Sequence, residues 1–78
     1  DDVMNQVNAE TKAWRSAELE KAQRLLAKGT PTEQVLQSLS RSLTQKMLHG
    51  AYQYLRTAAE DERQGRQTTL EQIFLKRD

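Results

Sequence analysis

Apolar side chains recur every three or four positions through the middle of the chain, and this spacing predicts a helix. At about 100° per residue, one stripe lies within about 60° of the direction of Leu36 and continues through six turns. Its members are Leu36, Leu39, Leu43, Met47, Gly50, Tyr54 and Ala58. A second line through Leu48 and Leu55 widens the stripe beyond the seam of a two-stranded coiled coil. The pattern therefore predicts a helix over about residues 31–63 that contacts more than one neighbour.

A long helix over about residues 2–28 should precede it. Residues 1–27 contain neither glycine nor proline and are rich in strong helix formers, and Gly29 can take the left-handed conformation that follows many helices. Thr30-Pro31-Thr32-Glu33 then has the order of an N-cap threonine, an N1 proline and an N3 glutamate. This order predicts a capping box and an antiparallel helical hairpin across a short turn.

A third, short helix is predicted over about residues 69–76. Leu70, Ile73 and Phe74 have the i, i+3, i+4 spacing of one helical face, and they follow a charged connection from Glu60 to Gln67. No alternation typical of a strand occurs. The fold class is therefore an all-α, three-helix fragment, with residues 1–78 forming a single domain. Whether the second helix continues through Gly50 stays open, because glycine weakens a helix by about 1 kcal/mol relative to alanine.

Composition limits what this chain can do. Its 78 residues make at most one small domain and leave no room for a catalytic domain beside it. It has no cysteine, so no disulfide can stabilise it. A chain of this size has good physical reason to bury more apolar surface against a partner.

Charge and hydropathy argue against two further classes of protein, nucleic-acid binders and membrane-spanning proteins. The 12 basic and 11 acidic residues give a net charge of +1, which argues against binding that depends on phosphate neutralisation. The longest uncharged stretches, Gln34–Ser40 and Met47–Leu55, are far shorter than the roughly 20 apolar residues of a membrane span. No secretory signal and no initiator methionine open the sequence, so we expect a soluble, cytoplasmic piece of a longer protein.

The sequence offers no catalytic, cofactor or metal site. His49 is the single histidine, and without cysteine it cannot complete a zinc site of the usual kinds. No nucleophile lies beside a base, and Glu60, Asp61 and Glu62 point in different directions, as expected of a solvated loop. An RNA-binding module remains the alternative, because no acidic residue lies between Glu33 and Glu60. Its candidate tRNA-facing residues are Arg41, Lys46, His49 and Arg56, which spread over most of the polar face.

One stretch of the predicted second helix resembles a known family. Residues 43–49 are Leu-Thr-Gln-Lys-Met-Leu-His. They resemble the Leu-Thr-Asn-Lys-Leu-Leu-His-Ala-Pro stretch in the C-terminal dimerisation domain of glutamyl-tRNA reductase. Gln45 stands where that stretch has asparagine, and Gly50-Ala51 stands where it has Ala-Pro. The proline would break the helix, so whether this chain has a break at the same position stays open.

The resemblance implies a dimerisation role, in which two copies form a symmetric helical bundle. It also implies a parent enzyme that uses NADPH to convert glutamyl-tRNA to glutamate-1-semialdehyde in tetrapyrrole (porphyrin) synthesis. The catalytic and NADPH-binding domains would precede this chain and bind the tRNA, so the fragment itself is expected to be non-catalytic and to hold no cofactor. The candidate core and interface residues are Leu36, Leu39, Leu43, Met47, Leu48, Tyr54 and Leu55.

Overall fold

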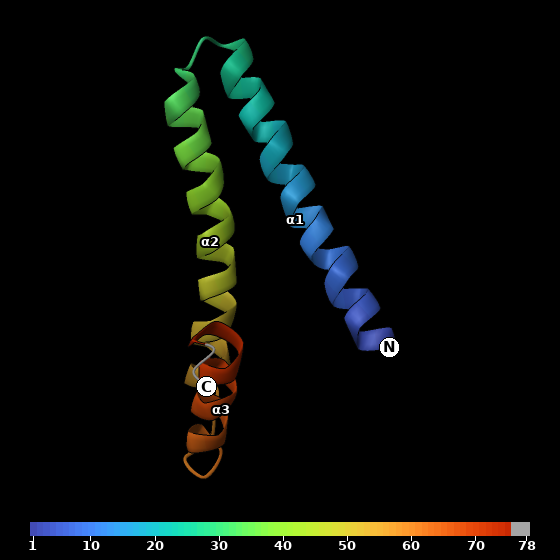
Figure 1. Ribbon diagram of the computed structural model, residues 1–78, viewed down its shortest axis with the longest axis vertical. Coiled ribbons are helices and arrows are strands. Elements are labelled where there is room, and N and C mark those ends of the chain that lie inside the picture. The colour runs from blue at the N-terminus through green and yellow to red at the C-terminus, as the bar shows by residue number, and fades with distance from the viewer. Residues whose placement is uncertain (76–78) are drawn as a thin grey trace. The chain divides into compact units, whose positions relative to one another are not determined.

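The computed structural model describes residues 1–75, which are helical apart from Asp1 and two connections (Figure 1). The helices are α1 (Asp2–Ala27), α2 (Thr32–Arg56), α3 (Arg63–Leu70) and a short π-helix, η1 (Glu71–Leu75). No strand occurs among these residues. The all-α prediction is therefore confirmed. The chain divides into two compact units between Gln45 and Lys46, and α2 contributes to both.

Hydrogen bonds close both ends of α1. The Asp1 carboxylate accepts from the Val3 N–H at 2.9 Å and caps the first turn. At the other end Gly29 has a φ of 92°, its N–H donates to the Leu26 carbonyl at 3.0 Å, and the Thr30 N–H donates to the Leu25 carbonyl at 3.1 Å. This pair of bonds is the Schellman motif. The prediction that glycine ends the first helix is confirmed.

The start of α2 differs from the prediction by one residue. The Pro31 carbonyl accepts the first helical bond, from the Val35 N–H at 3.1 Å, so Pro31 is the N-cap and Thr32 the first helical residue. Thr30 therefore lies outside the helix and Glu33 lies at N2. The predicted capping box, which needs Thr30 at N-cap and Glu33 at N3, is wrong.

The end of α2 differs more. The helix continues unbroken through Gly50 but ends at Arg56 instead of near residue 63, and residues 57–62 form a turn before α3. Near this end the Tyr54 carbonyl accepts a hydrogen bond from the Arg66 side chain. The predicted short helix over 69–76 corresponds to the end of α3 and to η1, and residue 76 lies outside the described residues.

Gly50 provides a test of the continuous helix. A Cβ added there would meet no heavy atom within 4 Å, so Gly50→Ala should stabilise the chain by about 1 kcal/mol and raise its melting temperature. Gly29→Ala is the opposite control, because its φ of 92° strains any L side chain. A melting temperature lowered by both changes would contradict the prediction and indicate that another helix packs tightly against Gly50.

Candidate functional site

The described chain buries few of its apolar side chains. Ala22 and Val35 are its buried hydrophobic residues, 8% and 2% exposed. Within the predicted interface, Leu36 and Met47 are more than half exposed, at 59% and 53%. Large exposed apolar surfaces of this kind mark sites of interaction. The rest of that predicted set is half-buried or exposed, namely Leu39, Leu43, Leu48, Tyr54 and Leu55.

A groove of about 480 Å³ lies between the second half of α2 and the α3–η1 segment. Its apolar walls are formed by Leu48, Ala51 and Leu55 on one side and Leu70, Phe74 and Leu75 on the other. Tyr52, Gln67 and Glu71 complete the lining. A π-helix places residues five apart on neighbouring turns, which explains how Leu75 joins Leu70 on this wall.

A separate hollow of about 490 Å³ lies along the first half of α2. Leu36, Leu39 and Leu43 line it together with two polar residues, Gln37 and Ser40. Tyr54 instead lines a third, smaller hollow beside Gly50 and Phe74. The predicted apolar stripe therefore runs along one helix, but its side chains line several separate hollows of the surface.

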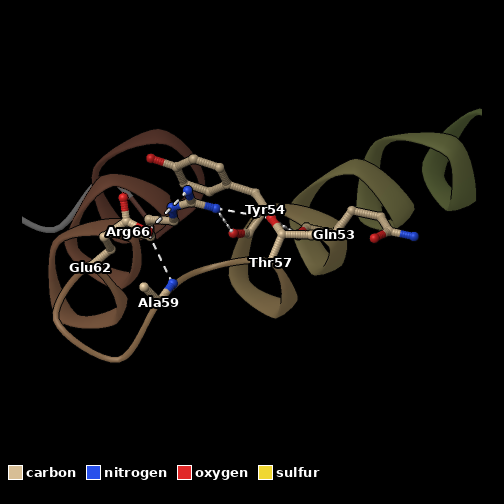
Figure 2. A network of polar contacts seen from close by, with 6 residues as sticks. All are labelled: Gln53, Tyr54, Thr57, Ala59, Glu62 and Arg66. Atoms are coloured by element: carbon tan, nitrogen blue, oxygen red, sulfur yellow. Dashed lines mark hydrogen bonds and ion pairs between the residues drawn. The ribbon is translucent and has the colours of Figure 1, made fainter.

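The side chain of Arg66 forms the corner between α2 and α3 (Figure 2). Its Nη1 donates to the Tyr54 carbonyl at 2.6 Å and to the Thr57 hydroxyl at 3.0 Å. Its Nη2 lies 3.7 Å from Glu62 Oε1, and its guanidinium carbon lies 4.8 Å from the centroid of the Tyr54 ring. Glu62 Oε1 also accepts from the Ala59 N–H at 3.0 Å. This network holds the end of α2 against the start of α3.

The basic candidates lie on the surface of α2. Arg41, Lys46, His49 and Arg56 are all exposed, and helical geometry spreads them over about 140° of the helix circumference. The structure does not gather them into a compact patch. Among residues 1–75, no group of three or more His, Asp or Glu side chains is arranged to hold a metal ion, and no helix is long and apolar enough to cross a bilayer.

Sequence reasoning missed several residues that matter here. Val35 is the most buried hydrophobic side chain described, and its i, i+4 spacing to Leu39 was a usable signal. The groove wall of Leu70, Phe74 and Leu75 was recognised as an apolar cluster, with Ile73 in place of Leu75, but not as part of a site. Arg66 gave no signal, because its partners lie up to twelve positions away in the sequence.

Comparisons with known proteins identify the family to which this chain is similar. The family model described as "Glutamyl-tRNAGlu reductase, dimerisation domain" matches residues 1–76. The glutamyl-tRNA reductase of Polaromonas naphthalenivorans is 43% identical over 95% of this chain and 17% of its own length. That of Albidiferax ferrireducens is 43% identical over 97% of this chain and 18% of its own length.

This chain therefore spans about a sixth of the length of the curated relatives that it matches. No solved structure matches it significantly. The family match covers nearly all of the sequence, including α2, α3 and η1, which carry the apolar surfaces described above. The chain belongs to the glutamyl-tRNA reductase dimerisation-domain family.

Proposed function

We propose that this chain pairs with a second copy of itself and that the two copies bury the apolar face of α2 in one shared helical bundle. The observation that carries the proposal is the exposure of that face. Leu36, Met47 and Leu48 are 59%, 53% and 43% exposed, while Ala22 and Val35 are the buried hydrophobic residues of the described chain. Covering such a surface removes apolar area from water, which is the main favourable contribution to association.

A symmetric pair would use the same residues from each copy. We assign the contact to the stripe of α2 and to the groove beside α3–η1, so that residues 1–78 act as one dimerisation domain although each unit by itself has little core. The residues assigned to the interface are Leu36, Leu39, Leu43, Met47, Leu48, Tyr54 and Leu55. The membership in a dimerisation-domain family supports this assignment.

We further propose that the pairing assembles a longer enzyme. The relatives named above are glutamyl-tRNA reductases about six times longer than the matching segment, so preceding domains would hold the catalytic and NADPH-binding residues. That enzyme would reduce glutamyl-tRNA to glutamate-1-semialdehyde for tetrapyrrole synthesis, and we place it in the cytoplasm with its tRNA. The part described here would supply dimer contacts and no catalytic group.

Static light scattering across a dilution series tests the pairing directly. We expect a particle of twice the 9.0 kDa chain mass at high concentration, which dissociates on dilution with loss of helical circular dichroism. A folded particle of single-chain mass at every concentration would contradict the proposal.

Direct tRNA contact through the exposed basic residues is the second candidate. The absence of acidic residues between Glu33 and Glu60 favours it. It requires that the isolated chain bind tRNA with an affinity that falls steeply with salt, because phosphate contacts release counterions. It also requires that alanine at Arg41, Lys46, His49 and Arg56 abolish this binding. Binding that survives those four changes would rule the candidate out.

A further inference from the structure

The amino acids after Arg56 favour a longer α2 than the one observed. Residues 57–62 are Thr-Ala-Ala-Glu-Asp-Glu, which contain no glycine or proline and include two alanines and two glutamates. Alanine and glutamate are among the strongest helix formers. The intrinsic helix propensity of these residues therefore does not explain the early end of α2.

Two side chains occupy the hydrogen bonds that a longer helix would form. In a continuing α-helix the Tyr54 carbonyl would accept from the Ala58 N–H, and the Leu55 carbonyl would accept from the Ala59 N–H. Here the Tyr54 carbonyl accepts from Arg66 Nη1 at 2.6 Å, and Ala58 N–H donates to the Leu55 carbonyl at 3.2 Å. The Ala59 N–H donates to Glu62 Oε1 at 3.0 Å.

The two substituting groups also support each other. Glu62 Oε1 lies 3.7 Å from Arg66 Nη2, and the Arg66 side chain is only 25% exposed. Its planar guanidinium has enough donors to reach the carbonyl, the hydroxyl and the carboxylate at once while lying over the Tyr54 ring (Figure 2).

We propose that Arg66 and Glu62 form a latch that selects a hairpin over a continuous helix. With the latch closed, α2 ends at Arg56 and α3–η1 folds back to form the groove wall of Leu70, Phe74 and Leu75. With the latch removed, α2 continues through residues 57–62 into α3 and the groove is lost. This inference goes beyond the proposed pairing, because it concerns the conformation within one chain.

A distance within one chain tests the latch. The chain has no cysteine, so cysteines placed at the exposed positions His49 and Gln72 carry the two spin labels, and an excess of unlabelled chain suppresses distances between copies. In the hairpin the helix axes lie about 8–10 Å apart, so the Cβ atoms of the two sites are separated by roughly 15–20 Å even though both face outward. In a continuous helix, roughly 23 residues at 1.5 Å each separate them by about 35 Å.

Arg66→Ala should shift the distance from the short to the long value while helical circular dichroism is kept or rises. Arg63→Ala is the matched control, because it removes the same charge from the same helix and should leave the short distance. If Arg66→Ala loses its helical signal, Glu62→Ala is measured in its place and should also lengthen the distance. Glu62→Gln should keep it short, because the amide oxygen still accepts from Ala59.

A short distance in folded Arg66→Ala, or in folded Glu62→Ala, would overturn the latch. These results do not depend on pairing. A chain that stays single on dilution yet shows the long distance in Arg66→Ala would reject the proposed dimer and retain the latch.

Discussion

Replacing Leu43 with aspartate should convert the paired chain into a monomer that is unfolded or weakly folded. Leu43 is half-buried within its own chain and lines the same hollow as Leu36 and Leu39. A second copy that covers this hollow would enclose an unpaired carboxylate from each chain. At about 2 kcal/mol or more per copy, the dimer should weaken by at least roughly a thousandfold. Sedimentation velocity together with circular dichroism measures both mass and folding.

Gln45→Asp is the matched control for Leu43→Asp. Gln45 lies two positions further along α2, is exposed, and faces about 180° away from Leu36, so it introduces the same charge on the opposite face. It should sediment as the unchanged dimer. A folded dimer of Leu43→Asp would show that the hollow of Leu36, Leu39 and Leu43 faces solvent in the assembly.

Truncating Leu48 should weaken pairing far more than truncating Leu19. Both leucines are 43% exposed in the single chain, but Leu48 lines the groove and belongs to the proposed interface, whereas Leu19 lies on α1 outside it. Leu→Ala in a fully buried site costs about 2–5 kcal/mol. If the second copy covers the exposed half, each chain loses roughly 1–2 kcal/mol of binding and the dimer dissociation constant rises on the order of a hundredfold.

Leu19→Ala should change the dissociation constant by less than about sixfold, because exposed substitutions usually stay within about 0.5 kcal/mol per copy. Sedimentation equilibrium over a concentration series measures both variants. Equal effects of the two substitutions would place the interface elsewhere than the groove. Leu48 and Leu19 have the same residue type and the same exposed fraction, so a difference between their dissociation constants reports which of the two the second copy covers.

Features that depend on neighbouring residues could be predicted from the sequence. The apolar spacing from Leu36 to Tyr54 predicted the long α2, and Gly29 predicted the end of α1, because a helical face and a left-handed cap are set within a few positions. The error at Pro31 was one residue. It arose because threonine is a stronger cap than proline in general, while here the Pro31 carbonyl accepts the first helical bond.

Features that depend on distant residues could not be predicted. The end of α2 at Arg56 coincides with contacts from Glu62 and Arg66, and Arg66 lies ten positions beyond that end. The groove forms only when the chain turns between α2 and α3. The sequence therefore predicted an apolar cluster on the last helix but not that its groove wall, Leu70, Phe74 and Leu75, faces α2. The candidate interface along α2 was found because its surface lies on one helix, and its coverage by a second copy stays a prediction.

Among the hydrophobic side chains described, Ala22 and Val35 are the buried ones, and this small core affects how the unpaired chain survives in a cell. A newly synthesised copy would leave five of its ten leucines exposed to water until a second copy arrives, and in that interval it is open to aggregation and to proteases. An unpaired copy would then be degraded faster than a paired one. Because both copies are the same product, the amount of paired chain would rise more steeply than in proportion to its rate of synthesis.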